Sequence, residues 1–421
     1  MRVPAGAASM GSPANLWRHR DFMLLWSGQS ISLFGDQFTL LALPYIAVKT
    51  LHAGPFQMGI LAAVGTLPFL LIAIFVGVWV DRHRRLPVLI AGDLGRGLII
   101  LSIALLAFGG LLRLDYLYVL GFLTGVLTVF FDVAYQAYLP SLVTRTQLVE
   151  GNSKLETTNS LAQTGGPFAA GVLVQAVSAA WAMAFDASTY FFSVAMMSRI
   201  RHREAPPAAA ERRPFLTEAR EGFAVVLGDP RLRAIAGCTS HFNLFGSAIA
   251  ALAILFAVND LGMDGFALGL VFLGGGIGGI LGALTSARIA ARIGVGPAIV
   301  VSTVLGSAAM YGYLAATPAT GVVVLVSVFV ATGFTVLLYN INQVSLRQGL
   351  VPVRLQGRLN ATMRFLVWGT MPLGGILGGA LGTVLGVRNA IGVAVIGLSF
   401  AFLWVLLSPV RSIRTMPEPM A

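Results

Sequence analysis

Residues 57–80 read QMGILAAVGTLPFLLIAIFVGVWV and carry no charged side chain, and the basic sequence DRHRR follows at residues 81–85. A helix needs about 20 mostly apolar residues to cross the hydrocarbon core of a bilayer. Basic residues in a short loop directly after such a run are typical of the cytoplasmic side of a membrane protein. The stretch therefore predicts a transmembrane helix followed by a short cytoplasmic loop.

Similar apolar runs occur along the whole chain. Open sheet edges cannot face lipid, so each run predicts a helix. The twelve runs cover residues 22–48, 57–80, 87–112, 116–139, 155–178, 181–200, 232–258, 266–287, 296–316, 320–345, 364–386 and 389–408. We therefore expect an all-α integral membrane protein with twelve transmembrane helices.

The composition agrees with a membrane protein and excludes soluble classes. Of the 421 residues, 57% are hydrophobic and only 11% are charged, whereas a soluble domain carries roughly 25% charged residues. Soluble enzymes and nucleic-acid-binding proteins are therefore excluded, despite the net charge of +11. The single cysteine, Cys238, excludes an internal disulfide and a cysteine-based metal cluster.

The longest hydrophilic stretch divides the chain into two groups of six helices. We expect one bundle over residues 1–200, a linker over residues 201–230, and a second bundle with a short tail over residues 231–421. Within the linker, Phe215–Leu227 has an apolar face that suits a helix at the membrane surface, although a solvated linker is an equally good interpretation. With both termini in the cytoplasm, 24 of the 28 Lys and Arg residues lie on the cytoplasmic side, which favours that topology.

The two halves resemble each other in sequence. Leu33-Phe34-Gly35 recurs as Leu244-Phe245-Gly246, and Pro167 corresponds to Pro372, within a set of matches whose offsets lie between 205 and 211 residues. Such duplications build transporters in which two pseudo-symmetric bundles rock around a central site.

One loop resembles a motif of the major facilitator superfamily of secondary transporters. The segment Gly77-Val-Trp-Val-Asp81-Arg82-His-Arg84-Arg85 is similar to the superfamily's loop between helices two and three, except that Arg84 replaces a glycine. The resemblance implies two six-helix bundles, transport by alternating access, and a gating role for Gly77, Asp81, Arg82 and Arg85.

A second resemblance lies in the fifth predicted helix. Gly166-Pro167 and Gly171 are similar to the helix-five motif of drug antiporters, with alanine replacing glycine at positions 162 and 170. Short phrases such as Tyr138-Leu-Pro140 look most like the branch that contains macrolide exporters and the enterobactin exporter. This branch implies proton-coupled efflux.

Ionisable residues inside predicted spans cost free energy and therefore mark functional or structural sites. Asp36, near the middle of its helix, is the first candidate for proton coupling, although a carboxyl hydrogen-bonded to a neighbouring helix is the alternative. Asp132 is the second, and it could instead pair with a basic residue of the gate. Asp93 and Arg96 are spaced for an ion pair on one helix face, with a gating role as the alternative, and Arg364 could neutralise Asp81 or line the inner vestibule.

Other polar and aromatic residues on predicted spans could hold a large, partly apolar substrate. Packing is the competing interpretation for each of them, and the stronger one for His241. The candidates are Gln29, Gln37, Tyr135, Gln136, His241, Asn243, Asn340, Gln343 and Trp368. We expect no catalytic residue, no metal site and no P-loop, because the glycine-rich segment 274–282 lacks the following Lys-Ser/Thr.

These observations predict a proton-coupled exporter of hydrophobic drugs (macrolide- or tetracycline-like) or of a siderophore. We expect it to act without a cofactor, as a monomer in the bacterial cytoplasmic membrane, with a small molecule and the bilayer as its partners and no nucleic acid. A facilitator or importer of a lipid-like metabolite is the alternative, and a membrane-embedded enzyme or receptor is a third, less favoured one.

Overall fold

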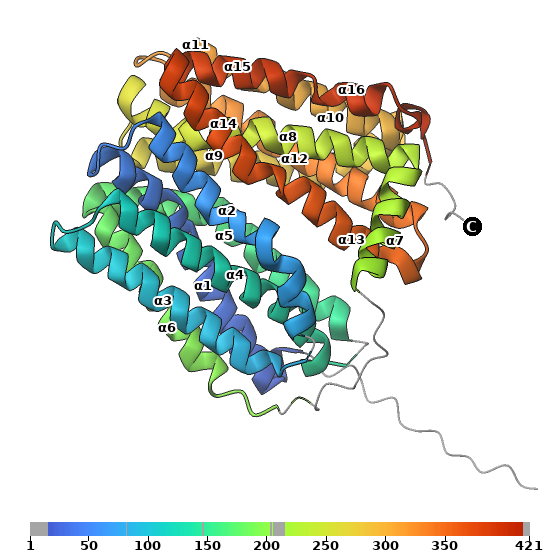
Figure 1. Cartoon of the computed structure of the whole chain (residues 1–421), viewed down its shortest axis with the longest axis horizontal. Coiled ribbons are helices and arrows are strands. Elements are labelled where there is room, and N and C mark those ends of the chain that lie inside the picture. The colour runs from blue at the N-terminus through green and yellow to red at the C-terminus, as the bar shows by residue number, and fades with distance from the viewer. Residues whose placement is uncertain (1–15, 81, 145–146, 203, 205–214, 416–421) are drawn as a thin grey trace, which may run out of the picture.

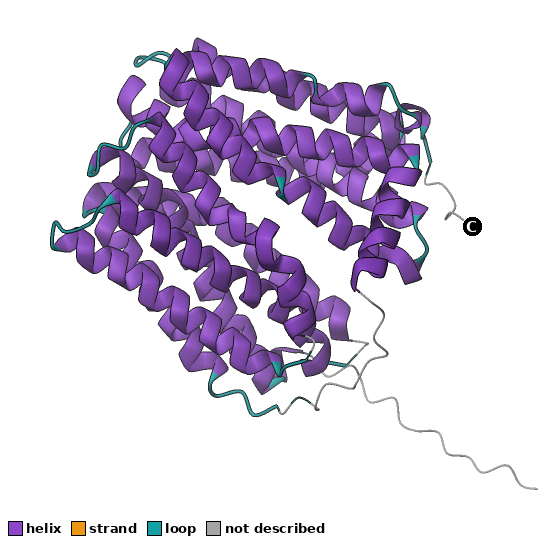
Figure 2. Cartoon of the chain, viewed as in Figure 1, coloured by secondary structure: helices purple, strands orange, loops and turns teal. Residues whose placement is uncertain are grey.

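A computed structural model describes residues 16–80, 82–144, 147–202, 204 and 215–415. Within these ranges every regular element is a helix (Figure 2). Asp81 of the loop motif lies outside the described residues, and so does most of the linker.

The first half is built from six long helices that run back and forth (Figure 1). Each begins or ends close to the bounds expected from hydropathy. They are α1 (Arg20–Lys49), α2 (Pro55–Val80), α3 (Arg85–Phe108), α4 (Leu114–Leu142), α5 (Leu148–Ala176) and α6 (Ala179–Met197).

The second half follows a short helix, α7 (Phe215–Gly228), which lies in the linker. Val226 of α7 is buried among residues of the second half. The remaining elements are α8 (Pro230–Leu255) with a π-helical turn (Phe256–Asp260), α9 (Gly265–Ile293), α10 (Val295–Met310) with α11 (Gly312–Ala315), α12 (Gly321–Leu350), α13 (Val353–Trp368) with α14 (Thr370–Leu385), and α15 (Val387–Ser399) with α16 (Ala401–Leu406).

Ten of the described helical segments are long and apolar enough to cross a membrane. The two other expected spans, α5 and α6, fall outside that group because polar residues lower their hydropathy, among them Asp186, Thr189 and Ser193 in α6. Both nevertheless pack inside the molecule, α5 between α1 and α9, and α6 against α1 and α3. The all-α membrane fold is confirmed, with six helical segments on either side of α7 in the part of the chain that is described.

The halves approach each other most closely at one end of the molecule. We call the end where α1 begins and α16 ends the linker end. At the opposite end, a Cβ added to Gly59 of α2 would lie 2.6 Å from the carbonyl oxygen of Gly375 on α14, and one added to Gly171 of α5 would overlap the carbonyl oxygen of Gly265 on α9. Figure 1 shows the two halves diverging from this contact toward the linker end.

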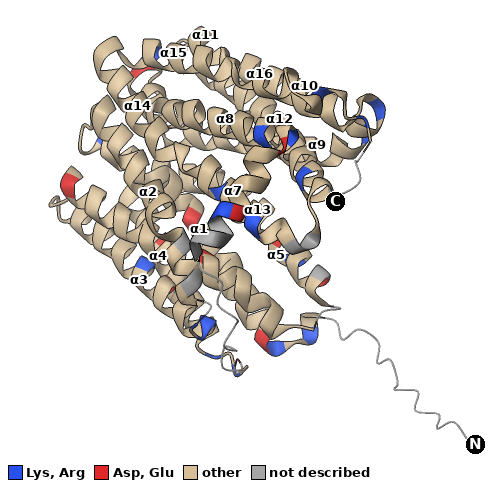
Figure 3. Ribbon diagram, turned by 45° about the vertical axis from the view of Figure 1, so that its right-hand side comes forward, with Lys and Arg blue, Asp and Glu red and all other residues tan. Residues whose placement is uncertain are grey.

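The charged residues follow the same polarity. Figure 3 shows that the middle parts of the helices carry few charged residues, whereas Lys and Arg gather toward the linker end, where α5 and α13 begin. Apolar side chains cover the helix surfaces elsewhere, among them Phe75, Val323 and Val384, each at least 70% exposed. A surface of this kind suits lipid.

The eleventh expected span differs from the structure in two ways. It begins at Val353 rather than near residue 364, and it is interrupted at Gly369. Pro372 has no N–H to continue the hydrogen-bonding ladder. Around this interruption the carbonyls of Leu366 and Val367 accept hydrogen bonds from Ser240 Oγ (3.1 Å) and Asn243 Nδ2 (3.0 Å) of α8.

Candidate functional site

A buried polar network joins α1, α3 and α6 inside the first half. The Tyr190 hydroxyl donates a hydrogen bond to Asp36 Oδ1 (2.5 Å), and Thr39 donates one to Asp186. Arg96 forms an ion pair with Asp93 on its own helix. Asp93, Arg96 and Asp186 are each at most 4% exposed, whereas Asp36 is half-buried.

Gln29, a cavity candidate, belongs to this network instead. Its amide nitrogen donates to Ser193 Oγ (3.2 Å) and lies 3.5 Å from Asp93 Oδ2. Both partners are fully buried. Gln29 therefore positions the Asp93 carboxylate.

Asp36 on α1 has a basic neighbour on another helix, Arg96 of α3. Its guanidinium lies over the rings of Phe131 (4.2 Å) and Tyr190 (4.8 Å) and within electrostatic range of Asp36 and Asp132. No Lys or Arg lies within one turn of Asp36 on α1. The neighbour comes from another helix, which spacing along α1 cannot reveal.

The second proton-coupling candidate, Asp132, lies on α4 at the side of this network. It is half-buried and interacts electrostatically with Arg96 and with Arg364 of the second half. Tyr135 stacks on Phe131 (5.8 Å between centroids), and its buried hydroxyl has no hydrogen-bond partner among the described residues. Gln136, on the next position, is exposed.

The loop motif is tied to the linker by a residue that the sequence analysis missed. The Glu204 carboxylate accepts hydrogen bonds from the backbone N–H of Arg85 (2.6 Å) and of Leu86 (3.2 Å), and it also pairs with the Arg85 guanidinium (3.4 Å). A carboxylate at this place satisfies free N–H groups at the start of α3. Gly77 has open space where a Cβ would stand, and Arg82 is exposed.

The helix-five motif contributes small residues where helices approach closely. A Cβ on Gly166 would lie 2.5 Å from Gln37 Cγ, so Gln37 packs on α5. Gly171 touches α9 across the interface between halves, and Pro167 lies inside α5. The motif therefore acts through packing in this structure.

Trp368 bridges the two halves near the middle of the molecule. Its ring lies 5.0 Å from that of Phe69 on α2, and the Arg364 guanidinium lies over it at 5.1 Å. Trp368 is 37% exposed and stands next to the interruption at Gly369.

The remaining candidates divide between packing and a pocket. His241 Nε2 is 2.8 Å from the carbonyl oxygen of Gly397, so it faces α15. Gln343 is buried, with its amide nitrogen 3.4 Å from Asn340 Oδ1. Asn243 and Asn340 line a pocket within the second half.

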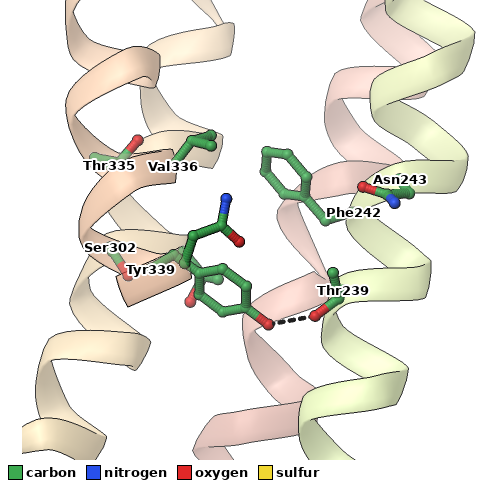
Figure 4. Close-up of a pocket in the computed structure, with 9 residues that line it drawn as sticks. Thr239, Phe242, Asn243, Ser302, Thr335, Val336 and Tyr339 are labelled. Atoms are coloured by element: carbon green, nitrogen blue, oxygen red, sulfur yellow. Dashed lines mark hydrogen bonds between the residues drawn. The ribbon is translucent and has the colours of Figure 1, made fainter. Parts of the chain in front are cut away.

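That pocket has a volume of about 80 Å³ and lies between α8, α10 and α12 (Figure 4). Its other lining residues were not singled out from sequence, although Thr335 and Tyr339 share a helix face with the expected Gln343. They are Thr239, Phe242, Ser302, Thr303, Thr335, Val336 and Tyr339. Among the described residues no group of three His, Cys, Asp or Glu side chains could hold a metal ion.

A family model described as transmembrane secretion effector matches residues 11–419. The chain belongs to this family of the major facilitator superfamily. It is therefore a multi-pass membrane transporter for small molecules, not an enzyme.

Relatives and solved structures agree with this assignment. Enterobactin exporter EntS of Salmonella typhimurium is 26% identical over 410 residues, covering 95% of each chain. Macrolide efflux protein A of Streptococcus pyogenes is 26% identical over 214 residues, covering 50% of this chain and 52% of that protein. The crystal structure of the nucleoside transporter NupG shares the fold, with a TM-score of 0.73 at 13% identity over 92% of this chain and 98% of NupG.

A crystal structure of a bacterial homologue of the iron transporter ferroportin, in an inward-facing state, is also similar. Its TM-score is 0.71 at 16% identity, and the match covers 92% of this chain and 98% of that one. These likenesses support the fold.

Proposed function

We propose that this transporter is a proton-coupled exporter of a hydrophobic drug or a siderophore-like metabolite. The observation that carries the proposal is the network in the first half, in which Asp93 pairs with Arg96 and Asp36, Asp132 and Asp186 lie within electrostatic range of the same guanidinium. The relatives named as an enterobactin exporter and a macrolide efflux protein favour export.

The charge balance of this network supports proton exchange. If all four carboxyls were ionised, Arg96 together with Arg364 beside Asp132 would leave two negative charges uncompensated. Each uncompensated charge in a low-dielectric interior costs several kcal/mol. Asp36 is the first candidate to exchange the proton. Its carboxyl is half-buried and accepts a hydrogen bond from Tyr190, whereas the Asp93 carboxylate is paired with Arg96. Asp132 is the second.

The proposed orientation places the linker end in the bacterial cytoplasm, because Lys and Arg gather there. The structure then corresponds to a conformation closed toward the outside, where glycines of α2 and α5 meet α14 and α9. Export also requires a second conformation, open toward the outside and closed at the linker end. Glu204, Arg85 and the loop motif are among the groups that would change partners between the two conformations.

One proton supplies enough free energy for export. A charge crossing 100 mV is worth about 2.3 kcal/mol, so a driving force of roughly 150 mV gives about 3.5 kcal/mol. At about 1.4 kcal/mol per tenfold, this sustains a substrate gradient of roughly 300-fold. Facilitated uptake of a lipid-like metabolite remains the competing function.

The test uses everted membrane vesicles that contain the full chain, a panel of labelled macrolides, tetracyclines and siderophores, and an uncoupler. We expect uptake of at least one compound into the vesicles, lost on addition of the uncoupler. Asp36→Asn should abolish this accumulation and leave downhill exchange intact.

Asp115→Asn is the matched control, because Asp115 is an exposed aspartate at the other end of the bundle, paired with Arg113 at 3.2 Å. Accumulation by Asp36→Asn equal to the parent would exclude Asp36 as the coupling group. Uptake that is insensitive to the uncoupler in the parent would favour the facilitator.

A further inference from the structure

We propose that the pocket between α8, α10 and α12 is a subsite for a neutral, hydroxyl-bearing ring of the transported molecule. The inference deepens the proposed function, because it assigns a chemical class to part of the substrate. It rests on the hydrogen-bonding state of the pocket wall.

The hydroxyls at the base of the pocket have already used their hydrogens. Ser302 Oγ donates to the carbonyl of Ile299 (2.9 Å), and Thr335 Oγ1 donates to the carbonyl of Ala331 (3.0 Å). Thr303 Oγ1 likewise donates to carbonyls of its own helix. A hydroxyl has one hydrogen and two acceptor lone pairs. These three buried side chains therefore present acceptors to the pocket.

The aromatic side of the pocket is fixed in the same way. Thr239 Oγ1 donates to the carbonyl of Ile235 (2.8 Å), so the Tyr339 hydroxyl, 2.7 Å away, is the donor in its contact with Thr239. Figure 4 shows this bond, with Phe242 projecting from α8 toward Val336 of α12. The ring of Phe242 and the side chain of Val336 supply apolar surface beside the acceptors.

A neutral group that donates hydrogen bonds suits these acceptors. No carboxylate lines the pocket among the described residues, so an ammonium would be buried without a partner at a cost of several kcal/mol. A ring with several hydroxyls satisfies the acceptors, and its apolar faces can contact Phe242.

The size and the mouth of the pocket agree with such a ring. A volume of about 80 Å³ holds on the order of five waters, which one hydroxylated six-membered ring can displace. Exposure increases from Ser302 and Thr335, at 2% and 4%, to Asn340, which is exposed. A ring can therefore enter past Asn340 while the rest of the substrate stays outside.

The test measures occupancy of the pocket and does not depend on transport. The reporter is Val336→Cys in a Cys238→Ala background, so that the new thiol is the only cysteine and lies in the pocket wall. The full-length protein is held in lipid nanodiscs or in a detergent without a sugar headgroup. Alkylation by N-ethylmaleimide is timed with para-nitrophenyl β-D-glucopyranoside, or with para-nitroanisole, which lacks the hydroxylated ring.

We expect the glucoside to slow alkylation about threefold at twice its Kd, as mass action requires, and the anisole to have no comparable effect. Adding Thr335→Val, which removes one acceptor, should abolish this protection. Thr332→Val is the matched control, because Thr332 is also buried on α12 and donates to the carbonyl four residues earlier (2.7 Å) but does not line the pocket.

Equal effects of the two compounds, no protection by either, or equal behaviour of Thr335→Val and Thr332→Val would overturn the proposal. Stronger protection by para-nitrobenzylamine, a cation, would also overturn it. Failure of efflux in the vesicle assay leaves this result unaffected, so the two proposals fail separately.

Discussion

Arg96 balances part of the negative charge that four aspartates bring into the first half. Its guanidinium pairs with Asp93 and is covered by the rings of Phe131 and Tyr190, which leaves it 4% exposed. Removing one partner of a buried pair costs more than the pair itself contributes, because the remaining charge is left without compensation.

Arg96→Met should therefore lower the free energy of unfolding by about 3–5 kcal/mol. The double variant Asp93→Asn/Arg96→Met should recover a large share of this loss, since it removes both charges. Thermal unfolding of the purified protein measures both values. Arg113→Ala, at an exposed pair, should change stability by at most about 1 kcal/mol, and an Arg96→Met protein as stable as this control would contradict the expectation.

At this scale the sequence predicts contacts within a helix better than contacts between helices. The spacing of Asp93 and Arg96 predicts their pairing because residues three apart share a helix face. The bond between Tyr190 and Asp36 joins residues 154 apart, and it depends on how α6 packs on α1. No local pattern contains that information, and the same holds for Glu204 at the start of α3.

At the scale of the element, helix ends are determined by caps as well as by hydropathy. Asp229 precedes α8, and its carboxylate accepts hydrogen bonds from the backbone N–H of Arg231 (2.7 Å) and of Leu232 (3.2 Å) and pairs with the Arg231 side chain. Burial alone would raise the pKa of Asp229, but the hydrogen bonds from Arg231 and Leu232 hold it below its usual value.

Asp229→Ala should cost about 1 kcal/mol of stability through loss of this cap. Because the folded pKa is lowered, the stabilisation by Asp229 is complete above the pKa of the unfolded chain, about 3.9, and is lost as the pH falls through the folded value. Thermal melts of parent and variant should therefore differ at neutral pH and converge in acid. A difference that persists unchanged in acid would contradict the role of the charge.

Hydropathy predicts the membrane-crossing part of most helices but not their full length. The helix expected from residue 364 begins at Val353 in the structure. Hydropathy misses its first turns because they carry Arg358 and other polar residues. These turns are held by α7, where a Cβ on Gly222 would lie 3.0 Å from the carbonyl oxygen of Arg358 and Glu221 pairs with Arg358. Tertiary contact extends the helix where composition alone would end it.

At the scale of the whole molecule, the internal duplication places glycines in equivalent contacts between the halves. Gly59 of α2 meets Gly379 of α14, and Gly171 of α5 meets Gly269 of α9. Gly59 and Gly269 differ by 210 residues, and Gly171 and Gly379 by 208, which agrees with the offsets of 205 to 211 found in sequence. The repeat could be predicted from sequence, but the role of these glycines required the packed structure.

The contact between Gly171 and α9 stabilises closure at the end opposite the linker, and so affects the balance between the two ends of the transporter. Gly171→Ala would place a methyl group against the backbone of α9, a clash that costs about 1–3 kcal/mol and applies only while the end opposite the linker is closed. Since 1.4 kcal/mol is about tenfold in population, this variant should increase opening at that end by about fivefold to about 150-fold. Alkylation of Ala62→Cys, beside Gly375 in a Cys238→Ala background, by a membrane-impermeant maleimide measures the opening. Gly165→Ala, with open space around its Cβ, should label like the parent, and equal labelling of both variants would show that the glycine contact does not control closure.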